Sequence, residues 1–340
     1  MPEAAVMSRE IRLAAIPDGL PGPADLAVAE VPVPVPGPGD LLVRNRFFTM
    51  FAGLRTLLGG GAPGAPLPGL GIGDTLFGPA VGEVITAADG GGPQAGDLVE
   101  HLLGWREYAV VPAASCRPVS GALADPVACL AQGVTPYGAL TRAARLRPDE
   151  TVFISGGAGS VGSMTGQIAR LLGAGRVIGS TGSPRKAEQM TTALGYDAVV
   201  VRGAAPLAAQ LAAAAPEGID VFIDNVGGED LRAAITTARP SARFVLVGAL
   251  SGQLAASGDG GTAPVEIDTY QLILKQVTMT GYVAGGDVEL RAEWARRFAG
   301  WLLSGAIQFP YTRVEGIDQA PQAFHDTLAG RYLGTVVIAV

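Results

Sequence analysis

An apolar run that breaks into glycines constrains the fold of this chain more than any other stretch. Residues 151–155 read Thr-Val-Phe-Ile-Ser, which is typical of a buried strand, and residues 163–172 have the apolar spacing of a helix. Between them, Gly157, Gly159 and Gly162 fit the pattern G-x-G-x-x-G. In such a strand–turn–helix unit the first glycine allows a sharp turn and the second lets the backbone approach a pyrophosphate. The third lets helix and strand pack closely, and the phosphates lie on the positive helix N-terminus.

This stretch predicts a dinucleotide site whose residues run through the turn into the helix: Gly157, Ala158, Gly159, Ser160, Val161 and Gly162. The triplet alone also fits an ordinary glycine-rich turn, because the chain has 49 glycines. The flanking strand and helix favour the nucleotide site.

The remaining segments predict an α/β protein with two domains. The middle of the chain alternates strand-like and helix-like runs, which predicts about six parallel strands in a doubly wound Rossmann sheet with helices on both faces. The first third carries short β-like runs split by proline and glycine, as in a small β-barrel or sandwich, and the C-terminal stretch returns to that pattern. We therefore expect a β domain formed by residues 1–124 and 305–340, and a nucleotide-binding domain formed by residues 125–304. Residues 53–70, rich in glycine and proline, are expected to form a mobile surface loop.

Charge and hydropathy exclude several classes of partner. The net charge is −7 and no basic block occurs, so neither a nucleic acid nor an anionic membrane surface is an expected partner. The chain lacks an apolar run of about 18 residues, which argues against a membrane span. Its first residues lack the basic and apolar regions of a secretory signal. We expect a cytoplasmic protein that binds small molecules.

The cysteines and histidines do not predict a metal site. The two cysteines, Cys116 and Cys129, are too far apart for a CxxC pair, and the chain has only two histidines, His101 and His325. Neither a four-cysteine structural zinc cluster nor a Cys/His/Glu catalytic set can be assembled from them. The four residues are expected to be structural.

The end of the second strand-like run of the alternating region indicates which dinucleotide binds. NAD-specific sites place an Asp or Glu about twenty residues after the glycines, where it binds the ribose 2′-hydroxyl. This chain has Ser180, Thr181 and Gly182 there, followed by Arg185 and Lys186. Hydroxyls and cations suit a 2′-phosphate, so NADPH is predicted over NADH. The alternative is a basic first turn of a helix that is exposed to solvent.

A second polar segment ends another buried, strand-like run. Residues 219–228 read Ile-Asp-Val-Phe-Ile-Asp-Asn-Val-Gly-Gly, so Asp224 and Asn225 are expected at the carboxyl edge of the sheet, where ligands bind open α/β sheets. Asn225 and Gly227 are candidates for contact with the cofactor. Equally, Asp224 and Asn225 fit residues that only cap the turn and the helix after it.

Several motifs together resemble one family. They are found at residues 31–45, 104–108, 133–138, 155–163, 166–170, 179–186, 224–228 and 266–271. In these motifs the chain resembles the zinc-independent medium-chain dehydrogenase/reductases, in particular the branch of leukotriene B4 12-hydroxydehydrogenase/prostaglandin reductases and alkenal double-bond reductases.

The resemblance implies a GroES-like β-barrel domain plus a Rossmann domain, NADPH in the cleft, and reduction of a carbon–carbon double bond conjugated to a carbonyl, without zinc. It implies that Lys186 binds the 2′-phosphate. It also implies that Tyr270 lies near the nicotinamide and the substrate carbonyl, where its hydroxyl can donate to the developing oxyanion. Alternatively, Tyr270 packs its ring and bonds a backbone carbonyl. Further cofactor contacts are expected at Val226, Gly248, Tyr282 and Val283.

Three segments depart from the family's pattern. Residues 50–55, Met-Phe-Ala-Gly-Leu-Arg, lack a tyrosine that often lines the substrate pocket. Arg202 replaces a tyrosine often found after the third Rossmann strand, and residues 332–335 read Tyr-Leu-Gly-Thr instead of Asn-Leu-Gly-Lys. These departures predict a changed substrate, or even a changed reaction on the same cofactor.

The leading hypothesis is an NADPH-dependent enone or enoyl reductase that serves the biosynthesis of a specialised metabolite. The alternatives are an NADPH quinone oxidoreductase and a noncatalytic NADPH-binding protein. Residues 276–283 are expected to form a strand at an exposed sheet edge, through which two subunits pair as a homodimer.

Overall fold

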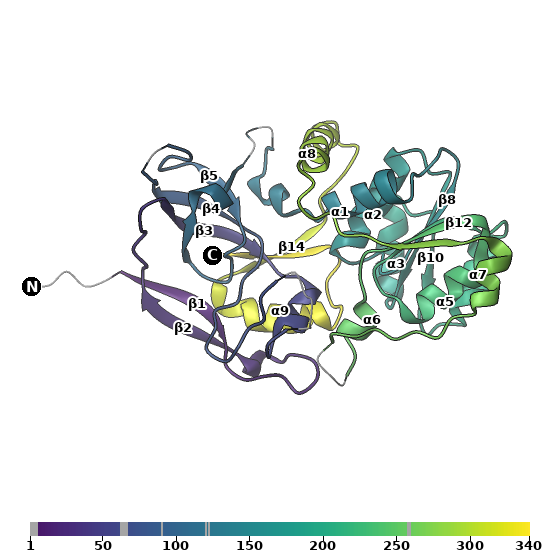
Figure 1. The fold of residues 1–340 in the computed structure, drawn as a ribbon, viewed down its shortest axis with the longest axis horizontal. Coiled ribbons are helices and arrows are strands. Elements are labelled where there is room, and N and C mark those ends of the chain that lie inside the picture. Colours follow the sequence, from purple (N-terminus) through teal and green to yellow (C-terminus); the bar gives the residue numbers. More distant parts are fainter. Residues whose placement is uncertain (1–5, 62–66, 90, 120, 122, 257–259) are drawn as a thin grey trace, which may run out of the picture. The chain divides into compact units, whose positions relative to one another are not determined.

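The computed structural model describes residues 6–61, 67–89, 91–119, 121, 123–256 and 260–340. The chain divides into two compact units, coloured along the sequence in Figure 1. Unit 1 contains Met1–Ala131, Ala255–Gly261 and Tyr311–Val340, and unit 2 contains Gln132–Leu254 and Thr262–Pro310. The boundaries expected from the sequence, after residues 124 and 304, lie a few residues earlier.

Unit 2 is built on one six-stranded sheet, whose strands are ordered β10-β9-β8-β11-β12-β13 and all pair in parallel. The strands are β8 (Thr151–Ile154), β9 (Arg176–Thr181), β10 (Ala198–Val201), β11 (Ile219–Asp224), β12 (Ala238–Leu246) and β13 (Thr278–Gly281). Numbered along the chain, this is the order 3-2-1-4-5-6 of a Rossmann sheet. The predicted α/β fold with a doubly wound parallel sheet is confirmed.

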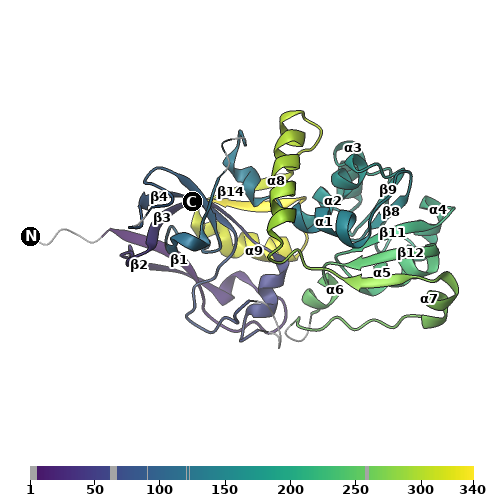
Figure 2. The same cartoon turned by 45° about the horizontal axis from the view of Figure 1, so that its top comes forward.

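Helices cover both faces of this sheet. The α-helices among the described residues of unit 2 are α1 (Val134–Gly138), α2 (Ser160–Leu171), α3 (Pro184–Ala193), α4 (Leu207–Ala214), α5 (Gly228–Thr237), α6 (Leu250–Gln253), α7 (Thr269–Lys275) and α8 (Val288–Leu303). Figure 2 shows α1, α2 and α3 on one side of the strands, and α5 and α7 on the other. Both faces are buried in this way, which explains why the strands read as continuous apolar runs.

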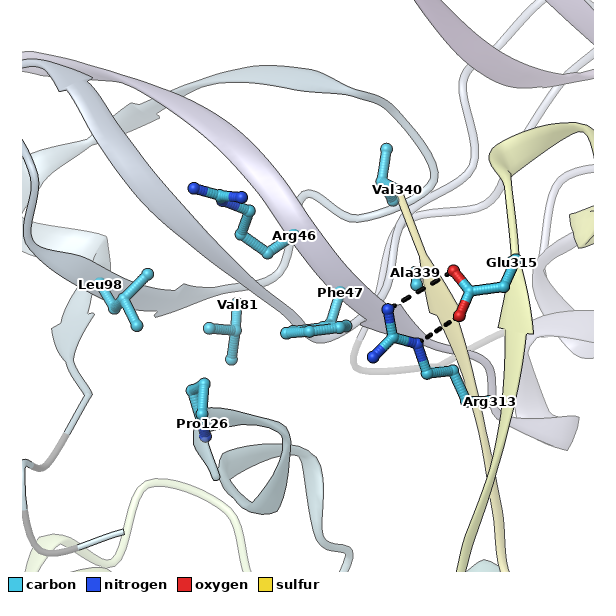
Figure 3. A pocket seen from close by; sticks show the side chains of 9 residues that line it. All are labelled: Arg46, Phe47, Val81, Leu98, Pro126, Arg313, Glu315, Ala339 and Val340. Atoms are coloured by element: carbon cyan, nitrogen blue, oxygen red, sulfur yellow. Dashed lines mark hydrogen bonds and ion pairs between the residues drawn. The ribbon is translucent and has the colours of Figure 1, made fainter. Parts of the chain in front are cut away.

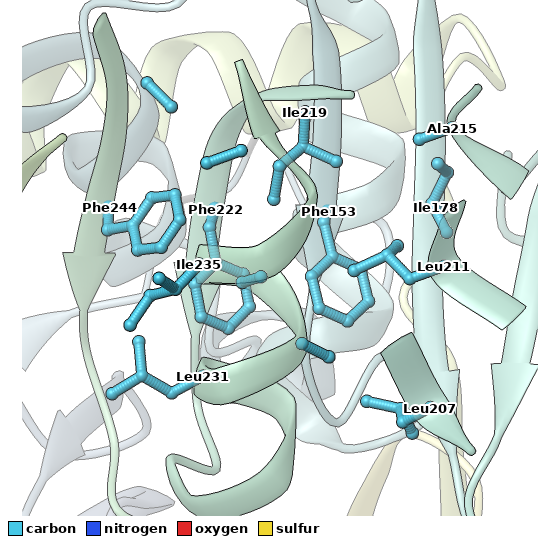
Figure 4. Packing of buried hydrophobic residues seen from close by; sticks show 14 of the residues in the cluster. Phe153, Ile178, Leu207, Leu211, Ala215, Ile219, Phe222, Leu231, Ile235 and Phe244 are labelled. Carbon is cyan, nitrogen blue, oxygen red and sulfur yellow. The ribbon is translucent and has the colours of Figure 1, made fainter. Parts of the chain in front are cut away.

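The packing of α4 and α5 on the sheet forms a core around three aromatic rings (Figure 4). Phe153 and Phe222 stack with ring centroids 5.0 Å apart, and Phe244 meets Phe222 edge-on at 5.3 Å. Leu207 from α4 and Leu231 from α5 close over them. This core fixes β8 beside β11, and these two strands end at the predicted nucleotide site.

Unit 1 is built mainly of antiparallel β structure. Its strands are β1 (Met7–Leu13), β2 (Leu26–Pro32), β3 (Asp40–Thr49), β4 (Ala80–Thr86), β5 (Leu98–His101), β6 (Tyr108–Pro112), β7 (Arg117–Pro118), β14 (Tyr311–Glu315) and β15 (Thr335–Ala339), with α9 (Ala320–Leu328) between the last two. Seven strands form one sheet, in which β15 pairs with β3, while β1 and β2 pair separately. The C-terminal strands therefore complete the sheet that β3 begins, as the GroES-like domain of the prediction requires.

One local prediction is wrong, and one helix was not predicted. Residues 53–70 are not all loop, because a 3-10 helix covers Ala52–Leu57 and Leu58 forms a bridge with Leu70. Buried leucines in this segment, Leu54 among them, replace the mobile loop that the glycines and prolines suggested; residues 62–66 lie outside the described residues. Helix α7, before the last strand of unit 2, was not foreseen.

Candidate functional site

The carboxyl ends of β8 and β11 meet at the point where the strand order of unit 2 reverses. To one side of β8 the order runs to β9 and β10, and to the other side it runs to β11, β12 and β13. Open α/β sheets bind ligands outside the carboxyl ends of their strands at such a switch point. The glycine turn after β8 and the polar residues after β11 both lie there.

In the glycine turn, the residue that makes the sharp turn differs from the predicted one. Gly156 has the left-handed backbone conformation, with φ of 60°, whereas Gly157 was expected to make the turn. A Cβ on Gly157 would instead meet the Met190 side chain at 2.5 Å, so this glycine serves side-chain packing. Because glycine adopts positive φ at no steric cost, the sequence provides the turn one residue earlier than the motif suggests.

At Gly162 the structure agrees with the predicted close packing, whereas the approach of a pyrophosphate to Gly159 stays a prediction. A Cβ on Gly162 would lie 2.3 Å from the Gly156 carbonyl oxygen, so α2 packs on the turn with no room for a side chain. Among the described residues, the nearest atom to a Cβ on Gly159 would be the same oxygen, at 3.4 Å, and the space beyond is open. This open space faces the N-terminus of α2, which is where a pyrophosphate binds in a Rossmann fold.

Hydrogen bonds tie the ends of β8 and β11 together. Asp224 Oδ1 accepts bonds from Ser155 Oγ at 2.7 Å and from the Val226 and Gly227 N–H groups at 2.9 and 2.8 Å. Asn225 donates from Nδ2 to the Ser155 carbonyl at 2.7 Å. These contacts match the structural alternative considered for Asp224 and Asn225, a capped turn, and contact of Asn225 or Val226 with the cofactor stays a prediction.

The hydroxyls at the end of β9 are engaged within the protein. Ser180 Oγ accepts a bond from the Gly156 N–H at 3.0 Å and donates to Asp230 Oδ1. Thr181 is buried, and its Oγ1 accepts a bond from the Ser183 N–H at 3.3 Å. Ser180 and Thr181 therefore shape the end of β9. Sequence reasoning missed Asp230, a buried acid that begins α5, because its partner Ser180 lies far away in the sequence.

Three cations gather at this end of β9. Arg185 is exposed and Lys186 is only 6% exposed, and both lie in the first turn of α3. Burial, with Arg185 beside it, lowers the pKa of Lys186. Arg202, which directly follows β10, extends to Asp230 and to Gly182, where a Cβ would lie 3.6 Å from its Nη2. A cationic group at the end of the second Rossmann strand suits a 2′-phosphate.

The remaining predicted cofactor contacts lie in separate places. Gly248 is held at the switch point, because its N–H donates to the Asp224 carbonyl at 3.0 Å. Tyr282 places its hydroxyl against α1, where a Cβ on Gly138 would lie 2.0 Å away, and Val283 is 80% exposed. Roles of Tyr282 and Val283 in cofactor binding stay predictions.

The structure does not bring Tyr270 together with the glycine turn. Tyr270 is 63% exposed in the first turn of α7, and the last residue of that helix, Lys275, donates to the Ile235 and Thr236 carbonyls at the end of α5. Both views place α7 at the far side of this unit from α2 and α6 (Figures 1 and 2). Its catalytic role stays a prediction.

One residue of the segments that depart from the family pattern, Arg55, borders a cavity in unit 1, whereas residues 332–335 do not line it. Arg55 is buried and donates to the Gly19 carbonyl from Nε and Nη2 at 3.2 and 3.0 Å. A cavity of about 220 Å³ lies beside it, lined also by Ile16, Leu58 and neighbouring residues. The altered segment 50–55 therefore includes a residue that shapes a cavity.

A larger groove of unit 1, about 310 Å³, does not carry an evident catalytic set (Figure 3). Arg313 lies over the Phe47 ring at 5.4 Å and pairs with Glu315 at 2.6 Å. Arg46, which also lines the groove, pairs with Glu83. Ion pairs at half-exposed side chains such as these contribute little and are ordinary surface features.

In the described part of the chain, no group of three or more His, Cys, Asp or Glu side chains is placed to hold a metal ion. Burial and the charge of Arg106 lower the pKa of His101 to about 4, and its Nδ1 accepts a bond from the Leu103 N–H at 3.0 Å. Within the same residues, no helix combines the length and the apolar character needed to cross a membrane.

A Rossmann unit with an open glycine turn and cations at the second strand, joined to a β unit, defines a nucleotide-dependent oxidoreductase of two domains. Two family profiles match the chain: "Zinc-binding dehydrogenase" over residues 160–302 and "N-terminal domain of oxidoreductase" over residues 9–119.

Known proteins are similar to this chain over most of its length. YfmJ of Bacillus subtilis, whose name describes an NADP-dependent oxidoreductase, is 33% identical over 78% of each chain. The NADP-dependent 2-alkenal reductase of Nicotiana tabacum is 28% identical over 82% of this chain and 78% of its own. The structure of CurA from Vibrio vulnificus in complex with NADPH superimposes with a TM-score of 0.87 at 28% identity, over 98% of this chain and 99% of that one.

The chain belongs to the medium-chain dehydrogenase/reductases, in their zinc-independent branch of prostaglandin and alkenal double-bond reductases. It is an oxidoreductase of that family.

Proposed function

We propose that this protein is an NADPH-dependent reductase of carbon–carbon double bonds conjugated to a carbonyl group, with a substrate from specialised metabolism. The observation that carries the proposal is the open glycine turn with cations at the end of β9, in a chain of this family. NADPH is the cofactor, in line with the NADPH complex of CurA and with the names of the relatives.

The residues of unit 2 fit this cofactor. Gly159 leaves space for the pyrophosphate at the N-terminus of α2, and Lys186 and Arg185 supply positive charge where the adenosine ribose is expected. When bound, NADPH supplies a hydride to the β-carbon of the substrate, and a proton at the α-carbon completes the saturated carbonyl. The residues of the chain bind NADPH and the substrate, and they stabilise the negative charge that develops on the substrate's carbonyl oxygen.

We propose Tyr270 as the donor of a hydrogen bond to that oxygen, on the basis of the family resemblance. Because Tyr270 lies on the exposed helix α7, this role requires α7 itself to move and bring the phenol to the substrate. The proton at the α-carbon comes from water or from Tyr270. The cavity beside Arg55 lies in the segment that departs from the family, which supports a substrate different from those of the relatives.

A substrate panel tests the proposed reaction. We expect enals, enones or enoyl thioesters to be reduced at least about tenfold more efficiently than quinones, measured as kcat/KM from the loss of NADPH absorbance and from the saturated product. The matching saturated carbonyl compounds are the control, since they lack the double bond. Faster turnover of quinones would contradict the proposal, and so would binding of NADPH without oxidation by any compound.

The same panel with Tyr270→Phe tests the donor. If Tyr270 stabilises the oxyanion, the substitution lowers kcat for conjugated carbonyls by about tenfold or more and leaves quinone reduction within about twofold. Unchanged rates with both substrate classes would rule out Tyr270 as the donor of this hydrogen bond.

We also propose that the protein forms a homodimer through β13. This strand is the last of the six in its sheet, and the apolar side chains of Ile273, Leu274 and Val283 around it are exposed. An uncovered strand edge with apolar side chains favours pairing with a second copy. Across a two-fold axis, two β13 strands would join the two sheets into one.

Light scattering tests this interface. We expect a mass near twice 34.5 kDa for the wild type, and dissociation of the dimer by the double substitution Leu274→Asp with Val283→Asp, because buried unpaired carboxylates are costly. Leu303→Asp is the control, since Leu303 is 88% exposed at the end of α8. A monomeric wild type, or a double variant that stays dimeric, would rule out this interface.

A further inference from the structure

Arg202 lies at the end of β9 although it follows β10, the next strand along the chain. It directly follows β10, which pairs with β9, and its N–H donates to the Thr181 carbonyl at 2.9 Å. Its guanidinium then lies beside Gly182, where a Cβ would be 3.6 Å from Nη2. The charge of Arg202 therefore lies at the end of the second strand of the sheet. In NAD-specific enzymes this place holds the Asp or Glu that binds the ribose 2′-hydroxyl.

A buried carboxylate holds this guanidinium. Asp230 is 1% exposed, and its Oδ2 lies 3.4 Å from Arg202 Nη1. Its Oδ1 accepts the Ser180 hydroxyl, which itself accepts the Gly156 N–H of the glycine turn. One chain of hydrogen bonds therefore runs from the turn, through Ser180 and Asp230, to Arg202, so the guanidinium is placed relative to the site that binds the pyrophosphate.

The remaining donors of Arg202 are suited to an anion. A guanidinium carries five N–H donors in a planar fork, and the contact with Asp230 is made by Nη1 alone. The side chain is 37% exposed, so the fork is accessible to a ligand. Arginine matches a phosphate by two parallel hydrogen bonds, whereas a lysine acts as a point charge.

We propose that Arg202 binds the 2′-phosphate of NADPH together with Lys186, and that it sets the preference of this protein for NADPH over NADH. The inference rests on NADPH as the cofactor and not on which substrate is reduced. A purely structural Arg202, present only to balance Asp230, would affect NADPH and NADH equally, and this difference makes the proposal testable.

The test is calorimetric binding without turnover, using two matched pairs of ligands: NADPH with NADH, and adenosine 2′,5′-bisphosphate with 5′-AMP. In Arg202→Gln we expect the Kd of both 2′-phosphorylated ligands to rise about tenfold or more, since a hydrogen-bonded charge is lost. The Kd of NADH and 5′-AMP should stay within about twofold. Arg239→Gln is the control, because Arg239 is similarly exposed and pairs with Asp220, near the start of β12 and away from the carboxyl ends of the strands.

Two results would overturn the proposal: an unchanged Kd for adenosine 2′,5′-bisphosphate, or equal weakening of the phosphorylated and unphosphorylated ligands. Arg202→Lys keeps the test decisive if Arg202→Gln does not fold, because it preserves the charge next to Asp230. In that variant we expect the 2′,5′-bisphosphate to bind several-fold more weakly and 5′-AMP to bind as before. If no conjugated carbonyl compound in the substrate panel were reduced, these binding results would be unaffected. The proposal for Arg202 and the proposed reductase activity can therefore be refuted independently.

Discussion

Replacing Gly162 with alanine should destabilise unit 2 and abolish NADPH binding. A Cβ at this position would lie 2.3 Å from the Gly156 carbonyl oxygen and 2.6 Å from Gly157 Cα. Both atoms are backbone, so relief requires α2 to move away from the turn. We expect a loss of about 3 kcal/mol or more in the free energy of unfolding, and a fall in Tm of roughly 6–12 °C. Thermal unfolding and fluorescence titration with NADPH measure the two effects.

Gly159→Ala is the matched control, since it adds the same methyl group to the same turn. Its Cβ would meet the Gly156 oxygen at 3.4 Å, and φ at Gly159 is −80°, which any residue adopts. We therefore expect a Tm within about 2 °C of the wild type but a Kd for NADPH at least about tenfold higher, because the methyl group occupies the approach of the pyrophosphate. A wild-type Tm in Gly162→Ala would refute the packing argument. Wild-type affinity in Gly159→Ala would place the pyrophosphate elsewhere.

The nucleotide half was predictable because its signals are local. Strands such as β8 and β11 are short apolar runs that end in glycine or polar residues, and the spacing of the glycines fits one turn geometry. The one displaced role, at Gly156, follows from a run of two glycines. Either could adopt positive φ, and in the structure Gly156 does so, while Gly157 leaves room for the side chain of Met190.

The network behind β9 could not be read from the sequence because its members lie far apart along the chain. Asp230 looks like an ordinary acid in the first turn of a helix, where acids are favoured. Only the fold shows that it faces Ser180 and Arg202. The sequence presented Arg202 simply as a departure from the family pattern, whereas the structure places it at the end of β9, beside Gly182.

Helix α7 was missed for a different reason. It has only seven residues, and it ends on Gln276, whose left-handed φ of 53° takes the place of the usual glycine signal. Tyr270 was carried over from the family without knowledge of this helix. Its exposed position is therefore the least predictable feature of the candidate site. Tyr270→Phe tests directly whether this residue acts in the reaction.

The second large effect is expected at Asp224, which joins the ends of β8 and β11. In Asp224→Ala the Val226 and Gly227 N–H groups and the Ser155 hydroxyl lose their common acceptor in a buried place. Each unsatisfied buried donor costs about 1–3 kcal/mol, so we expect unit 2 to lose roughly 3 kcal/mol or more of stability in urea unfolding. Asp220→Ala is the control, with an expected loss near 1 kcal/mol, because Asp220 is more exposed and accepts one backbone N–H besides its pair with Arg239.

Asp224→Asn separates the acceptor from the charge, since the amide oxygen can still accept the three bonds. We expect it to retain more than half of the stability that Asp224→Ala loses. The pH dependence gives a sharper test, because burial raises the pKa of Asp224 despite its hydrogen bonds. The folded protein therefore holds this proton more tightly than the unfolded chain does. This contribution is complete below the unfolded pKa, near ~3.9, and is lost as pH rises through the folded pKa.

Asparagine does not ionise, so the wild type should lose stability relative to Asp224→Asn as the pH rises from about 4 to about 7. Burial also raises the pKa of Asp230, and the charge of Asp224 raises it further, which an asparagine at position 224 does not do. This coupling between the two acids adds to the stability that the wild type loses relative to Asp224→Asn as the pH rises. Urea unfolding at a series of pH values measures that difference. A constant difference in unfolding free energy over this range would show that Asp224 has the same pKa in the folded and unfolded chains. Burial would then not destabilise the Asp224 carboxylate at the switch point.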